Sequence, residues 1–240
     1  MKKPYLEDVI EKYYLGGLVE RVKINVVDKT LTTKFISAQK NLVGVLEAPE
    51  VELPDCEFGV YDTSQLLKLI GITNHFLVLD VEMNKGIANK LLIADNEFNL
   101  EYALADTMLT PSVPSINEPN YAMVADLDEE FVARFLKAKK ALGTEVFTVK
   151  QVSVDNEPAI EFMLGGVEGY TNKINFSIKL KQSSVPGAPI KFPINEFGEI
   201  LSANKEFELG ELSVSEDGLL KIYFENKENV KVTYLLVGKE

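Results

Sequence analysis

Three basic residues of this sequence have a type and a spacing that suit them to bind a ligand. Arg134, Lys137 and Lys140 recur at intervals of three residues, which places them on one side of an α-helix. Guanidinium and ammonium groups in such a row are suited to contacting phosphates. The same spacing is also typical of a solvated helix face, so this helix alone does not decide between the two interpretations.

No catalytic set can be assembled from the other residue types. The single histidine, His75, precedes an apolar run and is interpreted as a strand-edge residue. The single cysteine, Cys56, excludes an intrachain disulfide and a cysteine metal cluster. There is no P-loop, and Gly165, Gly166 and Gly169 do not open a helix. We therefore expect that the protein is not an enzyme and uses no cofactor or metal.

The overall charge limits how this protein could bind DNA. The formal net charge is −12, whereas a protein that wraps DNA in positive charge would be basic. Any DNA contact must therefore be local, or held by something other than charge. No apolar run is long enough for a transmembrane helix, and the N-terminus is too acidic for a signal peptide. We expect a cytoplasmic protein without membrane contact.

The basic residues lie in a segment, residues 126–143, that predicts one amphipathic helix. Asp126 is placed to cap its start and Gly143 to close its end. Lys139 falls nearer the apolar side and is left out of the basic stripe. The apolar side chains that share a face are Leu127, Phe131, Phe135, Ala138 and Leu142.

Two similar halves can be recognised in the chain. FGVYDTSQLL at residues 58–67 aligns with FPINEFGEIL at residues 192–201, and each follows a helix and several strands. Asp62 and Gln65 have the spacing of a capping box. A proline-rich connector, TPSVPSINEPN, lies between the halves. We predict an α+β fold with domain 1 at residues 1–110, a connector at residues 111–122 and domain 2 at residues 123–240, each domain having two helices packed on antiparallel sheets.

These features resemble the DNA sliding clamps, or polymerase processivity factors, and look closest to those of T-even-like bacteriophages. The matching stretches are FGVYDTSQLLKLIGIT, LLIADNEFNLEYALAD before the connector, and DLDEEFVARFLKAKKALGTEVFTVK after it. The C-terminal VTYLLVGKE is similar to the last strand of that family. The resemblance covers nearly the whole chain. Because clamps have no catalytic signature, the order of elements carries it.

The resemblance implies a homotrimeric ring that encircles double-stranded DNA without regard to sequence and tethers the replicative DNA polymerase for processive synthesis. A clamp loader is a further expected partner, and RNA polymerase factors would be partners in a role as a late-transcription co-activator. If the source is a virus, the location is the host cell cytoplasm. The helices of such a ring line its hole. The DNA-facing candidates are Lys3, Lys12, Lys68, Arg134, Lys137, Lys140 and Lys205.

The resemblance also implies a pocket for partner peptides near the connector and the last strand. Its candidates are Leu109, Pro111, Val113, Tyr234 and Leu236, for which plain core or loop packing is the other interpretation. Ring closure needs sheet edges that pair between chains. Our candidates are residues 99–104 and 170–176, and the expected subunit-interface residues are Tyr102, Leu104, Tyr170 and Ile174.

Two other classes of protein stay open from the sequence. One is a β-rich binding module that holds protein partners without DNA contact. The other is an enzyme whose site is built from scattered acidic residues. A mass measurement separates the first class from a clamp, because a clamp should be a trimer or become one on assembly.

Overall fold

Two compact units make up the chain in the computed structural model, which describes residues 1–166, 172–183 and 188–239. Unit 1 contains Met1–Pro114 and Lys227–Val232, and unit 2 contains Ser115–Asn226 and Thr233–Glu240. The division after Pro114 lies inside the predicted connector, residues 111–122. The grouping of residues 227–232 with the first unit was not predicted from the sequence.

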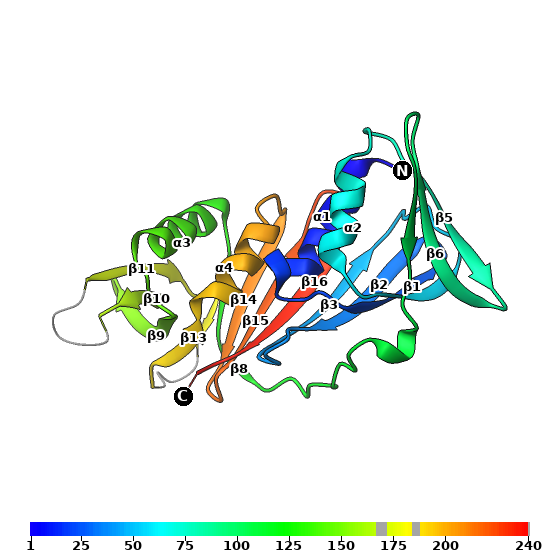
Figure 1. The fold of residues 1–240 in the computed structure, drawn as a ribbon. Helices are drawn as coiled ribbons and strands as arrows, with labels where there is room; N and C mark the ends of the chain where they lie inside the picture. Colours follow the sequence, from blue (N-terminus) through cyan, green and yellow to red (C-terminus); the bar gives the residue numbers. More distant parts are fainter. Residues whose placement is uncertain (167–171, 184–187, 240) are drawn as a thin grey trace. The chain divides into compact units, whose positions relative to one another are not determined.

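Unit 1 contains two helices and two antiparallel sheets (Figure 1). In the first sheet the strand order is β3-β2-β1-β4, so the last strand pairs back onto the first. The second sheet has the order β5-β6-β7. The elements are α1 (Lys3–Tyr14), η1 (Leu15–Gly17), β1 (Val22–Val27), β2 (Thr30–Ile36), β3 (Leu42–Ala48), β4 (Cys56–Val60), α2 (Thr63–Gly71), β5 (Val78–Asn84), β6 (Ile87–Ala94), β7 (Asn99–Ala103) and η2 (Thr107–Leu109).

Unit 2 repeats this plan with two additional strands. Its first helix leads into a sheet of order β11-β10-β9-β13, and its other strands have the order β12-β8-β14-β15-β16. The added strands are β8, which precedes the helix, and the short strand β12, which pairs with β8. The elements are β8 (Tyr121–Asp126), α3 (Glu129–Ala141), β9 (Val146–Val154), β10 (Glu157–Gly165), β11 (Lys173–Lys179), β12 (Gln182–Ser183), β13 (Ile190–Pro193), α4 (Ile194–Ala203), β14 (Leu209–Ser215), β15 (Leu219–Glu225) and β16 (Lys231–Val237), whose first two residues belong to unit 1.

The two segments that align in sequence occupy equivalent positions. Phe58 lies on β4, which pairs with β1 and leads into α2. Phe192 lies on β13, which pairs with β9 and leads into α4. In both units the partner strand is the first one after the first helix. The predicted internal duplication is therefore confirmed.

Helix capping agrees with the sequence in one unit and differs in the other. The Asp62 carboxylate accepts a hydrogen bond from the backbone N–H of Gln65 at 2.8 Å, as the capping spacing predicted. Asp126, in contrast, ends strand β8 and does not cap a helix. The cap of α3 is Asp128, whose carboxylate accepts from the N–H of Phe131 at 2.6 Å. The predicted start of this helix was wrong because the short strand before it went unrecognised.

Aromatic packing holds the first helix of unit 2 on its sheet. Phe131 and Phe135 are fully buried, with ring centroids 4.9 Å from Phe162 and 5.1 Å from Phe147 respectively. Phe197 of α4 lies 4.7 Å from Phe135 and so joins the two helices. Each such side chain contributes about 1.5–3 kcal/mol on burial. This cluster fixes which side of α3 remains exposed.

Gly44 provides a test of the packing in unit 1. It lies directly opposite Phe35 in the β2–β3 pair, and a Cβ at this position would come within 2.0 Å of the Phe35 ring. Gly44→Ala should therefore lower the free energy of unfolding by about 1–3 kcal/mol, since the buried ring must leave its place. Denaturant unfolding measures the change. Gly71→Ala is the control, because no described atom outside its own helix backbone and its chain neighbours lies within 4 Å of its Cβ position. Equal stability of the two variants would contradict this account.

Candidate DNA-facing helices and partner groove

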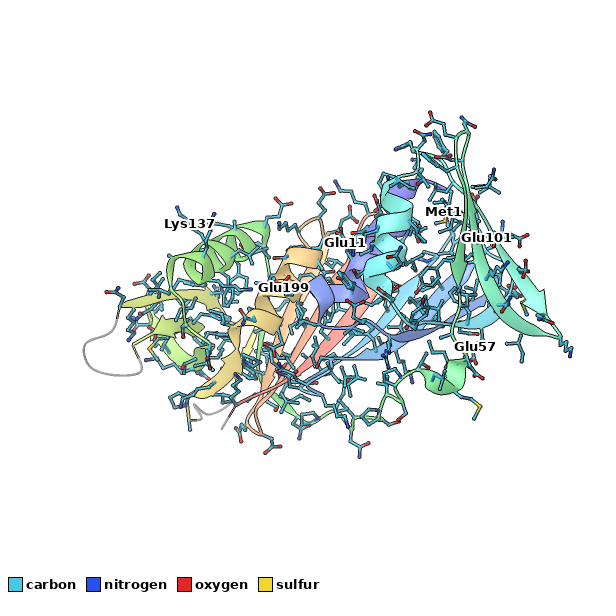
Figure 2. All side chains as sticks on the ribbon, viewed as in Figure 1. Met1, Glu11, Glu57, Glu101, Lys137 and Glu199 are labelled. Carbon is cyan, nitrogen blue, oxygen red and sulfur yellow. The ribbon has the colours of Figure 1, made fainter. Side chains whose placement is uncertain are left out.

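The exposed side of α3 is basic, as the sequence predicted. Its buried residues are Phe131, Val132, Phe135 and Ala138, whereas Lys137 and Lys140 are exposed. Figure 2 shows the Lys137 side chain on the side of α3 that faces away from the strands of its unit. The aromatic cluster therefore holds these ammonium groups toward solvent.

Arg134 is less free than the two lysines beside it. Its guanidinium donates to the Glu130 carboxylate at 3.0 Å, and it lies 5.5 Å from the centre of the Phe176 ring. This ion pair partly neutralises the positive charge that Arg134 would otherwise offer to a phosphate. Lys139 pairs with Glu199 of α4 at 3.3 Å, which agrees with its exclusion from the basic stripe.

The first helix of unit 1 does not present the basic residues predicted for it. Lys12 is only 2% exposed and pairs with Asp8 at 2.6 Å, so the prediction that it faces DNA is wrong. Lys3 donates to the backbone oxygens of Gly71 and Thr73 at 2.8 and 2.9 Å, where it satisfies carbonyls at the end of α2. These contacts make both lysines part of the unit's own packing.

Both units carry further exposed charged residues on or next to their helices. Glu11 is exposed on α1, whereas Lys68 is exposed on α2 and Lys205 follows α4. Within the described helices, the exposed basic side chains are therefore Lys68 on α2 and Lys137 and Lys140 on α3. Any contact of the helices with phosphates would depend mainly on α3.

A groove of about 790 Å³ lies on the outer face of the first sheet of unit 1. Its floor comes from residues of the neighbouring strands β1, β2, β3 and β4, and the chain from Thr107 to Val113 forms its wall. The side chains of the floor are Lys23, Asn25, Thr32, Thr33, Lys34, Val45 and Glu57. The groove is thus mixed in character, with apolar patches beside charged groups.

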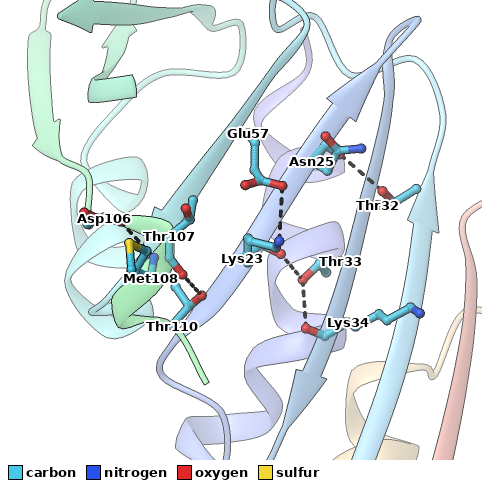
Figure 3. Close-up of polar contacts among 10 residues, drawn as sticks. All are labelled: Lys23, Asn25, Thr32, Thr33, Lys34, Glu57, Asp106, Thr107, Met108 and Thr110. Atoms are coloured by element: carbon cyan, nitrogen blue, oxygen red, sulfur yellow. Dashed lines mark hydrogen bonds and ion pairs between the residues drawn. The ribbon is translucent and has the colours of Figure 1, made fainter. Parts of the chain in front are cut away.

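Local hydrogen bonds hold the floor and wall of this groove (Figure 3). Lys23 pairs with Glu57 at 3.2 Å across β1 and β4. In the wall, the Asp106 carboxylate accepts from the N–H of Met108 at 2.8 Å, and the Thr110 hydroxyl donates to the Thr107 carbonyl at 2.6 Å. These turns give the segment a defined conformation without burying its side chains.

The groove contains some of the residues predicted for a partner pocket. Pro111 and Val113 line it. Leu109 is 73% exposed and lies outside its lining. Tyr234 and Leu236 are fully buried within unit 2, where the Tyr234 hydroxyl accepts from Asn204 at 2.8 Å. This burial corrects their assignment to a pocket, because neither side chain offers surface to a peptide.

The sequence did not predict the floor of the groove. Lys23 and Asn25 alternate with buried Val22, Ile24 and Val26, so their outward direction was already visible as a strand pattern. The missing information was tertiary, since nothing in the sequence shows that the segment after β7 runs beside this face.

The predicted subunit-interface residues have different surroundings. β7 and β11 are both edge strands, and Leu104 and Ile174 are half-buried. Tyr102, however, is buried: its hydroxyl donates to the Asp62 carbonyl at 3.0 Å, its ring stacks on Tyr61, and burial raises its pKa to about 12. This burial corrects the assignment of Tyr102 to the subunit interface, because its side chain offers little surface to a neighbouring copy. Tyr170 lies outside the described residues.

Two further properties concern the described part of the chain. It contains no group of three or more His, Cys, Asp or Glu residues placed to hold a metal ion. Among its helices, none combines the length and the apolar character needed to cross a membrane. His75 lies just before β5 and accepts a backbone hydrogen bond from Lys3 at 2.8 Å, and Cys56 begins β4.

Comparison with known proteins identifies the fold. No family profile matches the sequence, and no curated protein matches it. Among solved structures, the chain is similar to PCNA from A. fulgidus bound to the C-terminal region of FEN-1, with a TM-score of 0.79 and 15% identity over 100% of this chain and 97% of that one. It is also similar to PCNA from Entamoeba histolytica, with a TM-score of 0.77, 15% identity and the same coverage. The chain therefore has the α+β fold of the sliding clamps over its whole length.

Proposed function

We propose that this protein is a sliding clamp that encircles duplex DNA and tethers a DNA polymerase. The observation that carries the proposal is the likeness to two PCNA structures over the whole chain, including both units. The exposed lysines of α3 fit this function, because DNA held inside a ring needs only weak phosphate contacts. The acidic total charge is compatible with it, since closure of a ring retains DNA without strong attraction.

The proposed ring consists of three copies of the chain. Closure through β7 of one copy and β11 of the next would pair two edge strands that otherwise lie at the ends of their sheets. A clamp loader would open or assemble this ring on DNA. A phage origin and a role as a co-activator of late transcription, through RNA polymerase factors, belong to the same proposal.

The proposed partner site is the groove on unit 1. In the A. fulgidus structure the clamp is bound to the C-terminal region of FEN-1, so a protein of this fold binds a peptide segment. Here the groove offers apolar side chains such as Val45 and Val113 beside polar ones. We expect the polymerase and the clamp loader to use it. A β-rich protein-binding module without DNA contact is the alternative, and the groove alone would suit it equally well.

The DNA-facing surface is tested by Lys137→Glu combined with Lys140→Glu. Arg134 is left in place because its pairing with Glu130 also supports the helix. Weakening two phosphate contacts worth about 0.7 kcal/mol each should shorten polymerase runs roughly tenfold at low salt. The defect should shrink as salt screens the repulsion. Primer extension with the matching loader and polymerase, run across a salt series, measures this.

A matched pair of substitutions controls for the change in charge. Lys191 and Lys231 are exposed on strands, so Lys191→Glu with Lys231→Glu alters the net charge equally without touching α3. Normal run lengths are expected in this control. Normal run lengths in the α3 variant at every salt concentration would show that these two lysines do not face the DNA and that the basic side of α3 is an ordinary solvated surface.

The partner groove is tested by Val45→Glu. Val45 is 45% exposed on the groove floor, and a carboxylate there should repel an apolar peptide segment and weaken polymerase binding at least roughly tenfold. The control is Val154→Glu, because Val154 is 44% exposed at the end of β9 in the other unit. Calorimetric titration of the polymerase into each variant gives the Kd. Equal affinities for the two variants would place the partner site elsewhere.

A further inference from the structure

The outer edge of β5 is open in unit 1. β5 ends its sheet and pairs with β6 along one side only. On the other side the described residues supply a single bridge between Lys2 and Phe76, next to which Leu77 exchanges backbone hydrogen bonds with Met1 at 2.9 and 2.7 Å. Among the described residues, no strand lies along that side of β5 from Leu79 to Met83. Figure 1 shows β6 beside β5.

Unit 2 shows that this position in the fold accepts a strand. β14 follows α4 as β5 follows α2, and both begin the last three strands of their unit. The outer edge of β14 is covered by β8, which pairs with it in antiparallel register from Tyr121 to Asp126. An added strand on β5 would therefore repeat an arrangement that the chain already contains.

Several exposed apolar side chains lie on β5 or in the parts of the chain that adjoin it in the sequence. Among the described residues, five of the fourteen exposed large apolar side chains lie between positions 72 and 87. Phe76 and Val78 are the most exposed of these, at 67% and 71%. Exposed apolar surface beside an unpaired strand edge is typical of a surface that binds a partner. These five side chains are Ile72, Phe76, Val78, Met83 and Ile87.

Charge restricts what can bind there. Asp80 and Glu82 are exposed on β5, on the side of the sheet opposite buried Leu79 and Val81. Leu77 directs its backbone groups to the outer edge, and alternate residues of a strand share an edge, so the Val81 N–H points outward too. The Asp80 carboxylate accepts from that N–H at 2.8 Å. An incoming strand must displace this contact.

A basic strand can displace the hydrogen bond between the Asp80 carboxylate and the Val81 N–H, whereas a second copy of β5 cannot do so favourably. Pairing β5 with itself would bring Asp80 and Glu82 close to the same carboxylates of the copy, and like charges on neighbouring strands are destabilising. A lysine or arginine would instead give the displaced Asp80 carboxylate a new partner. The apolar residues that alternate with these basic ones would then lie next to Leu79 and Val81.

We propose that the outer edge of β5 binds an extended segment of a partner protein in which basic and apolar residues alternate, and that this segment adds a strand along Leu79–Met83. The site is separate from the groove and from α3. Its existence does not depend on the clamp function. It would give the protein a second surface for partners, one that selects cationic segments.

The test uses the full chain and two fluorescent octapeptides, one alternating lysine with valine and one alternating glutamate with valine. Anisotropy titration gives each Kd, and hydrogen exchange follows the Leu79 amide. The lysine peptide should bind at least roughly tenfold more tightly than the glutamate peptide. It should also slow exchange of the Leu79 amide, because that N–H would enter a ladder.

Charge reversal separates strand addition from general attraction to an acidic protein. Asp80→Lys with Glu82→Lys should reverse the preference between the peptides. Glu97→Lys with Glu216→Lys changes the net charge equally at exposed turns and should preserve it. Reversed preference with Leu79 protection supports the proposal. Absence of binding, binding without Leu79 protection, or equal behaviour of the two double variants would overturn it.

Discussion

Burial of one side of each helix against its own sheet is the constraint on which the other features depend. In α3 the buried side is aromatic, and the packing of Phe131 and Phe135 against other rings of unit 2 sets the orientation of the helix. That orientation leaves Lys137 and Lys140 in solvent. The same constraint acts in α1, where it draws Lys12 inward and leaves Glu11 outside. The distribution of charge on the helices is thus a consequence of core packing.

The duplicated topology explains where the two proposed binding surfaces lie. Because β4 returns beside β1, the segment after β7 can run close to this edge, and Ala105 forms a bridge with Gly59. A Cβ on Gly59 would come within 2.8 Å of the Ala105 carbonyl, so the absence of a side chain permits the approach. The groove follows from this route. The edge of β5 is open because the described part of unit 1 has no counterpart of β8, the strand that covers the equivalent edge of β14 in unit 2.

Sequence patterns predicted the features that depend on local chemistry. The repeat of Phe58 and Phe192 was visible because both units use an aromatic residue in the strand that leads into a helix. The cap at Asp62 followed from its spacing to Gln65. The basic side of α3 followed from helical periodicity, which the aromatic cluster enforces.

The failures concern residues whose burial was not anticipated, and for two of them the partners come from distant parts of the chain. Lys12 was assigned to the surface by residue type, but its stem is buried and its ammonium pairs with Asp8 one turn earlier. Tyr102 was assigned to an exposed edge, yet its hydroxyl meets the backbone of Asp62, forty residues away. Tyr234 is enclosed through a contact with Asn204. The contacts of Tyr102 and Tyr234 have no signature in the local pattern, whereas Asp8 and Lys12 have the i, i+4 spacing of a helix ion pair.

The central claim is that topology retains this acidic protein on DNA. The most direct measurement is its lifetime on covalently closed circular duplex, compared with the same duplex after it has been cut once, with the protein loaded by its matching loader. If the protein encircles DNA, it will stay on the circle and slide off the ends of the cut molecule. Equal lifetimes on the two substrates would contradict the claim, because a protein held by surface contacts alone does not distinguish a circle from a line.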